Sequence, residues 1–167
     1  MKTRIGFSTP NWFNPVSWLV RKFTKSKCSH TWFVYYDVDF QKDMVMEAHE
    51  LGFRLIAFEH FKKHNNVVAI IEPAVPLDEG LVWASDWLGS MYNYAGLIGT
   101  IVVLLGRMLR KKWNNPVNNT HGMFCSEMAV TVLQRVKHPS IDALVARDTT
   151  PQDLMDFMLQ MGKRSST

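Results

Sequence analysis

The chain has 167 residues, 47% of them hydrophobic and 20% charged, which is typical of one folded domain. The net charge is only +4, and its short basic clusters come without a zinc, RNA-binding or helix-turn-helix signature, which argues against specific nucleic-acid binding. Two cysteines exclude a disulfide framework, and neither a signal peptide nor an apolar run of about 20 residues is recognisable. We therefore expect a reduced, cytoplasmic protein, with envelope association left open.

The first half of the sequence predicts a mostly antiparallel sheet joined by short loops. A short helix is expected over residues 15–23, with Asn14 as its N-cap, and residues 59–64 read as a charged connection. β-Branched and aromatic residues in short runs mark the strands. Those strands are expected at residues 5–8, 30–38, 44–48, 52–58 and 67–71.

The second half predicts helices. Apolar residues recur at helical spacing over 78–91. Residues 96–109 are expected to form a mostly buried helix, with a membrane-facing patch as the alternative for its apolar run. A third helix should begin at Cys125 and end near residue 138, followed by a short segment of undecided type. Thr150, as an N-cap before Pro151, starts the last helix. We expect one domain over residues 1–162 and a flexible tail over 163–167.

The strongest functional signal is the run from His121 to Glu127 around Cys125. A polar, turn-forming stretch ends there and the helical pattern begins, so Cys125 lies at or just before a helix N-terminus. That end of a helix favours a thiolate, and its unpaired amides can bind an oxyanion. A cysteine that merely packs in the core is the competing interpretation.

A thiol nucleophile needs a base and a group that orients the base. His30 opens the most apolar strand, and Glu47 lies within the apolar strand expected to pair beside it. A carboxylate facing an imidazole would fix the tautomer and orientation of the ring. A histidine packed at the sheet edge and a glutamate on the wet face of the sheet remain the alternatives.

The other histidines carry weaker signals. His60 and His64 are four residues apart, but no third ligand completes a metal site. His121 is a rival base in a loop. The glycines are scattered and form no phosphate-binding loop, so we expect neither a metal nor a cofactor.

Five short motifs, in this order, resemble those of the circularly permuted NlpC-like cysteine hydrolases, in particular the YiiX-like branch, with a more distant similarity to lecithin:retinol acyltransferase. They are Ser26-Lys27-Cys28-Ser29-His30, Met46-Glu47-Ala48, Gly89-Ser90-Met91-Tyr92-Asn93-Tyr94, Phe124-Cys125-Ser126-Glu127 and Thr150-Pro151-Gln152-Asp153-Leu154. The family's opening Gly-Asp pair is missing, and Asn93 stands where an aspartate is common.

The resemblance implies an α+β, permuted papain-like fold in which an antiparallel sheet packs against the cysteine helix. It implies Cys125 as nucleophile, His30 as general base and Glu47 as orienting residue, with Ser126, Tyr92 and Tyr94 in substrate binding or the oxyanion hole. The expected reaction is cleavage of an amide or ester through a thioester, on a cell-wall peptide or a lipid-linked substrate, with peripheral membrane or wall contact left open. The alternative is a non-catalytic bacterial or phage accessory protein that keeps the fold and binds an envelope partner.

Overall fold

The computed structural model describes residues 2–12, 17–18, 21–22, 26–111, 113–114, 116 and 122–164. The fold is α+β and is built on one five-stranded sheet in which neighbouring strands are antiparallel. The strand order is β4-β3-β2-β1-β5. The strands are β1 (Arg4–Pro10), β2 (His30–Asp37), β3 (Lys42–His49), β4 (Gly52–Ala57) and β5 (Asn65–Ile71). All five predicted strands are present, and β2 pairs with β3 as expected.

The link between β4 and β5 differs from the prediction. Residues 58–64 form a short helix, α2 (Phe58–His64), instead of an irregular connection. Phe61 explains the helix, because its ring is fully buried and lies 4.6 Å from the ring of Trp32 on β2, measured between centroids. This packing fixes a segment that is too short to form a stable helix alone. The crossover carries β5 to the far edge of the sheet, beside β1.

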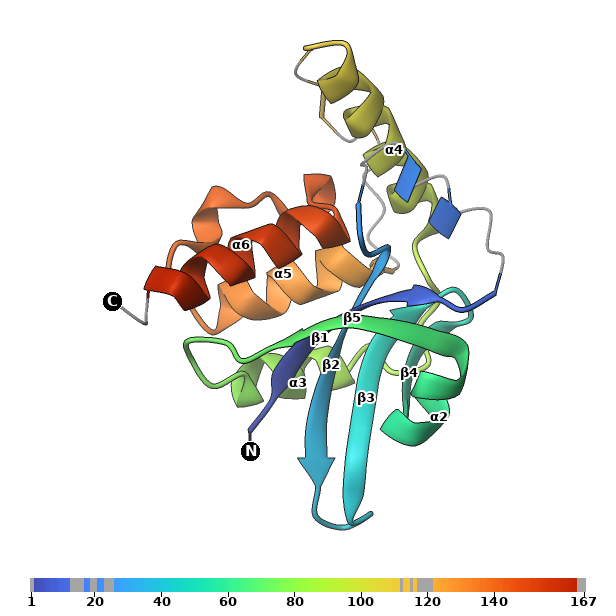
Figure 1. Ribbon diagram of the computed structural model, residues 1–167, viewed down its shortest axis with the longest axis vertical. Helices are drawn as coiled ribbons and strands as arrows, with labels where there is room; N and C mark the ends of the chain where they lie inside the picture. The colour runs from blue at the N-terminus through green and yellow to red at the C-terminus, as the bar shows by residue number, and fades with distance from the viewer. Residues whose placement is uncertain are drawn as a thin grey trace.

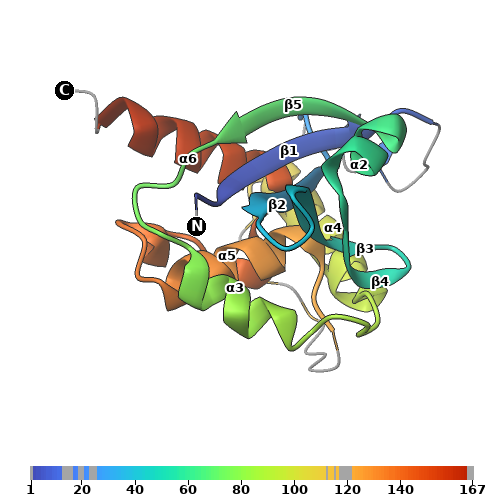
Figure 2. The ribbon, with the colours of Figure 1, turned by 90° about the horizontal axis from the view of Figure 1, so that it is seen from below.

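Both faces of the sheet are covered. Residues such as Phe33 and Met46 point into the main core with the helices α3 (Asp78–Ser85), α5 (Cys125–Arg135) and α6 (Pro151–Arg164). Trp32 and Val45 point to the other side, into a small core with α2 (Figure 2). Since side chains alternate along a strand, His30 and Glu47 lie on the α2 side with these two residues.

Helix α3 ends at Ser85, earlier than the predicted end at residue 91. The following backbone binds the edge of the sheet instead of continuing the helix. The Gly89 N–H donates to the Phe53 carbonyl and the Phe53 N–H to the Ser90 carbonyl, both at 2.9 Å. Gly89 has a φ of +83°, a conformation that glycine adopts without strain, so it turns the chain towards β4.

The predicted helix over residues 96–109 is present as α4 (Tyr94–Met108), and it is only partly buried. It protrudes from the body of the molecule (Figure 1), and the exposed fractions of Ile98 on the helix and of Leu109 directly after it are 62% and 61%, whereas Thr100 and Val103 are buried. One contact that holds the inner face of α4 is the Thr100 hydroxyl, which lies 3.0 Å from the carbonyl oxygen of Arg147. No helix in the described ranges is long and apolar enough to cross a bilayer.

The last helix starts as predicted. The Thr150 hydroxyl accepts from the Asp153 N–H at 3.1 Å, and the Asp153 carboxylate accepts from the Thr150 N–H at 3.0 Å, which forms a capping box. Two 3₁₀ turns precede it, η1 (Ile141–Ala143) and η2 (Ala146–Asp148). Helix α6 reaches Arg164, inside the predicted tail, and residues 165–167 lie outside the described residues. Most of the predicted helix over 15–23 also lies outside them, although residues 17–18 and 21–22 are helical.

Candidate active site

Cys125 is the first residue of α5, as the sequence predicts. Phe124 before it is extended, and its N–H donates to the Glu127 carboxylate at 3.4 Å. This contact is one half of a capping box, and it fixes the point at which the helix begins. The amides of the first helical turn have no partners within the helix, so the Cys125 thiol lies at the positive end of the helix dipole.

His30 and Glu47 form a close pair. The distance from His30 Nε2 to Glu47 Oε2 is 2.6 Å, and the Glu47 side chain is 0% exposed. Glu47 is therefore not on a wet face of the sheet, because α2 and the small core cover that side. With Nε2 bound to the carboxylate, Nδ1 is the ring nitrogen left for the thiol.

Arg54 holds the other oxygen of the same carboxylate. Its Nε and Nη2 atoms lie 2.7 Å and 2.6 Å from Glu47 Oε1. Glu47 and Arg54 are directly opposite in the β3–β4 register. The sequence analysis missed Arg54. An arginine inside an apolar strand, next to a strand that contains an unexplained glutamate, was the available signal.

The thiol and the imidazole shift each other's pKa in the direction of an ion pair. Burial alone would raise the pKa of Cys125, but the hydrogen bond and charge of His30, together with the Thr31 N–H and the Tyr92 hydroxyl, lower it below its usual value. Burial would lower the pKa of His30, but Cys125 and Glu47 raise it to about 10. Both shifts favour the state in which the proton resides on the imidazole and Cys125 is a thiolate.

The carboxylate remains ionised under the same conditions. Burial would raise the pKa of Glu47, but the hydrogen bond and charge of His30 and the two contacts from Arg54 lower it to about 2. The site thus contains a row of four groups, the thiol, the imidazole, the carboxylate and the guanidinium, whose pKa shifts favour alternating charges. Each charge would be stabilised by its neighbour.

Three further residues were predicted near the nucleophile, and the structure brings two of them there. The Tyr92 hydroxyl interacts with both the thiol and the backbone of Cys125, and burial and that thiol raise its pKa well above the usual value. Tyr94 lines the same pocket and donates to the Glu50 carbonyl at 2.7 Å. Ser126 points away from the site and is fully buried, and its hydroxyl donates to the Thr149 carbonyl at 2.7 Å.

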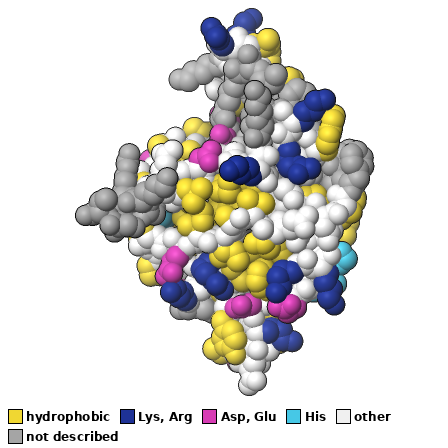
Figure 3. Space-filling model, viewed as in Figure 1, with side chains coloured by type: hydrophobic (Ala, Val, Ile, Leu, Met, Phe, Trp, Pro, Cys, Tyr) yellow, Lys and Arg dark blue, Asp and Glu magenta, His cyan; other side chains and the backbone are white. Residues whose placement is uncertain are grey.

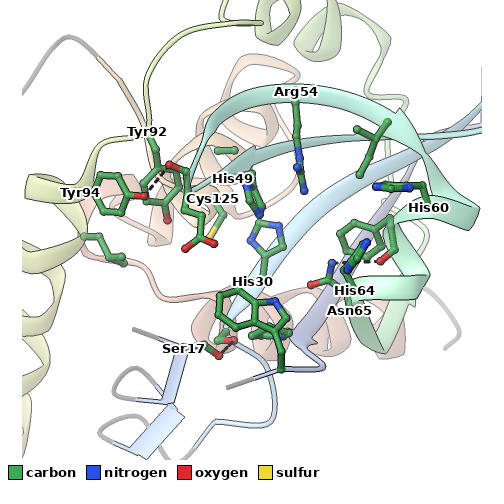
Figure 4. A pocket seen from close by; sticks show the side chains of 18 residues that line it. Ser17, His30, His49, Arg54, His60, His64, Asn65, Tyr92, Tyr94 and Cys125 are labelled. Atoms are coloured by element: carbon green, nitrogen blue, oxygen red, sulfur yellow. Dashed lines mark hydrogen bonds between the residues drawn. The ribbon is translucent and has the colours of Figure 1, made fainter. Parts of the chain in front are cut away.

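The pocket in front of Cys125 has a volume of about 340 Å³. Figure 4 shows His30, His49 and Cys125 at its centre, with the two tyrosines on one side and the α2 histidines on the other. Most of its wall is apolar or aromatic, which suits an organic substrate with few charges. Besides residues already named, the lining includes Pro10, Trp12, Ser17, Ser29, Ala48, Ile56, Phe61, His60, His64, Asn65 and Leu97.

The remaining candidates take no part in the charged row. Cys28 is buried in the main core, and burial, with Cys125 and Asp156, raises its pKa to about 12. His60 and His64 have ring centroids 5.1 Å apart, but the described residues contain no group of three or more His, Cys, Asp or Glu that could hold a metal ion. His121 lies outside the described residues.

A comparison of the sequence with protein-family models and with curated protein sequences finds no match.

Proposed function

We propose that the protein is a thiol hydrolase that cleaves an amide or ester bond through a thioester acyl-enzyme. The observation that carries the proposal is the meeting of Cys125, His30 and Glu47, contributed by a helix start and two paired strands, at one pocket. A packed cysteine and an isolated histidine would need neither a helix terminus nor a fully buried carboxylate. Burying this carboxylate carries a cost that a purely structural site has no reason to bear.

In the proposed reaction, the Cys125 thiolate attacks the substrate carbonyl carbon and forms a C–S bond. The C–N or C–O bond then breaks as the His30 imidazolium gives its proton to the leaving amine or alcohol. Water next attacks the thioester carbonyl carbon while His30 accepts a proton from it. The C–S bond then breaks, which releases the carboxylic acid and restores the Cys125 thiolate and the His30 imidazolium. Glu47 keeps Nε2 of His30 protonated throughout, so that Nδ1 exchanges the proton with the reacting groups.

The oxyanion that forms in each step needs donors beside Sγ. The Tyr92 hydroxyl and the amides of the first turn of α5 lie beside the thiol and are suitable donors. We further propose that the sheet followed by the cysteine helix is a permuted papain-like arrangement, with peptides or lipid-linked amides and esters as substrates. A reducing compartment such as the cytoplasm is part of the proposal, because the thiol must stay reduced.

The test is the alkylation rate of Cys125 with iodoacetamide as a function of pH. It is measured in a Cys28→Ser background with and without His30→Ala, and circular dichroism confirms that both proteins fold. We expect rapid alkylation well below pH 8.5 in the parent, and a shift of the profile to more alkaline pH in His30→Ala. A mass adduct on Cys125 after incubation with peptide, lipid-amide or lipid-ester substrates would then identify the acyl group.

If the parent protein is alkylated only at strongly alkaline pH or on unfolding, the three residues do not work together and the hydrolase proposal is wrong. A non-catalytic binding protein would then be the better description. The same conclusion follows if His30→Ala leaves the pH profile unchanged.

A further inference from the structure

The charges of this protein are separated along its sequence. All 15 Asp and Glu residues lie within 37–86 and 127–167. Residues 1–36 contain six Lys or Arg, residues 87–126 contain four, and neither segment contains an acidic residue. These two ranges are called the basic segments below. A small overall net charge thus conceals a strongly cationic part of the chain.

Both basic segments border the catalytic pocket. Trp12 and Ser17 of the first segment line it, as do Tyr94 and Leu97 of the second. The two segments are far apart in sequence, but the fold brings both of them to the same pocket. Each basic segment therefore contributes side chains to the wall of the pocket that contains Cys125.

The same segments expose large aromatic side chains. Among the described residues, three tryptophans are exposed, and all three belong to the basic segments: Trp12 (53%), Trp18 and Trp113. The Lys22 ammonium lies 4.6 Å from the ring centroid of Trp18, so a cation and an indole are presented together. Tryptophan and lysine side by side are typical of residues at the level of lipid headgroups.

Helix α4 adds an apolar stripe that starts at the pocket. Ile98, Val102 and Leu105 follow one another at spacings of four and three residues, which places them on one face of the helix, and Leu109 follows directly after the helix end. Ile98 and Leu109 are mostly exposed, and Val102 and Leu105 are half-buried. Basic residues follow the helix, and Figure 3 shows Lys and Arg side chains at the tip of the protrusion.

We propose that this surface binds an anionic lipid membrane, with α4 and the exposed tryptophans at headgroup depth and the Lys and Arg side chains on lipid phosphates. Aliphatic and indole groups gain free energy at a bilayer interface, and cations gain it from anionic headgroups. A nucleic acid would satisfy the cations, but it would leave the aliphatic stripe of α4 in water. The combination therefore favours a lipid surface.

The membrane contact also narrows the substrate class, and this step rests on the proposed hydrolase function. Tyr94 lines the pocket and lies four residues before Ile98, so the apolar stripe begins one helical turn from the pocket wall. An acyl chain that follows this stripe would stay in contact with apolar side chains as it approaches the pocket. We therefore favour lipid amides and esters over soluble peptides.

The test is vesicle flotation of the full-length Cys125→Ala protein, which cannot turn over substrate. Vesicles consist of phosphatidylcholine alone, or of phosphatidylcholine with about a third phosphatidylglycerol, at about 50 mM and about 500 mM NaCl. We expect binding to the anionic vesicles that weakens at high salt. Ile98→Glu should weaken it at least about tenfold, because one apolar anchor is lost and a repelling charge is introduced.

Val38→Glu is the matched control. Val38 is 72% exposed and lies in the β2–β3 turn, at the opposite end of the molecule from α4 (Figure 1). Its effect should be less than about twofold, because this turn lies far from the proposed membrane surface. The proposal is overturned if the protein floats with neither kind of vesicle, or if the two Glu variants bind equally well. Binding to duplex DNA in preference to anionic vesicles would also overturn it.

These outcomes are separate from the test of catalysis. If Cys125 shows alkylation that depends on His30 but the protein does not float, the hydrolase survives and only the membrane proposal fails. If the protein floats with anionic vesicles but Cys125 is unreactive, the membrane-binding proposal stands and the hydrolase proposal fails.

Discussion

Glu47→Gln is the sharpest test of how the site works, because the structure dictates which way the new amide must face. The neighbour at Oε1 is Arg54, a guanidinium that can only donate hydrogen bonds. The carbonyl of a glutamine must therefore turn to Arg54, and its NH₂ group must face His30 Nε2. Since that NH₂ group is also a donor, Nε2 must become an acceptor, and the ring proton moves to Nδ1.

The consequence for the thiol can be worked out. An imidazole with its proton on Nδ1, facing Cys125, cannot take the thiol proton, so the ion pair is lost. The pKa of Cys125 then rises, because burial no longer has an opposing cation. Each unit by which that pKa exceeds the pH lowers the thiolate fraction about tenfold, so alkylation at pH 7 should slow at least about tenfold. Removing a charge from the buried pair should also lower the free energy of unfolding by about 3 kcal/mol.

The assay is stopped-flow alkylation from pH 5 to pH 9, beside urea denaturation. Glu72→Gln makes the same chemical change at an exposed site, where the carboxylate pairs with Lys2, and it should react like the parent. Adding Arg54→Met to Glu47→Gln frees the amide to turn its carbonyl to His30, so the double variant should react faster than the single one. A Glu47→Gln protein that alkylates like the parent at pH 7 would refute the reasoning.

Three other changes have defined outcomes. Because the pKa of Glu47 is lowered to about 2, the stability that its carboxylate contributes is complete above pH 4.5 and is lost as the pH falls towards 2. Because the pKa of His30 is raised to about 10, the stability that its imidazolium contributes is complete below pH 6.5 and is lost as the pH rises through 10. Urea denaturation across the pH range should show both losses. Ser126→Ala should lower the free energy of unfolding by about 1–3 kcal/mol, because a buried carbonyl loses its donor, yet leave alkylation unchanged. Tyr92→Phe should raise the pKa of Cys125 by about one unit, measured by thiolate absorbance, since a hydrogen bond to a charged group is worth about 1.5 kcal/mol.

The strands and the cysteine helix could be predicted because their signals are local. β-Branched and aromatic residues mark the strand that begins at His30, and a polar run followed by helical spacing marks the start at Cys125. Glu47 was identified as unusual for the right reason, as a carboxylate among apolar neighbours. These features depend only on residues close in sequence.

Arg54 and Ser126 could not be placed in this way. The role of Arg54 follows from the β3–β4 register, which puts it directly opposite Glu47, and register is set by the whole sheet. Ser126 follows the nucleophile in sequence, but a helix turns successive side chains by about 100°, so its hydroxyl points to the carbonyl of Thr149, directly after η2, and not to the pocket. Composition likewise showed that α4 is apolar, but not whether the rest of the molecule covers it.

The two backbone hydrogen bonds between Phe53 and residues 89–90 connect the protection of a sheet edge to the site around Cys125. β4 is an edge strand, and an uncovered edge is a template for pairing with another chain. The segment that covers this edge runs directly on to Tyr92, which contacts the thiol. A form of the protein in which this segment has left the edge would also lack the contact of Tyr92 with the thiol, so exposure of the edge and a change in the reactivity of Cys125 are expected together.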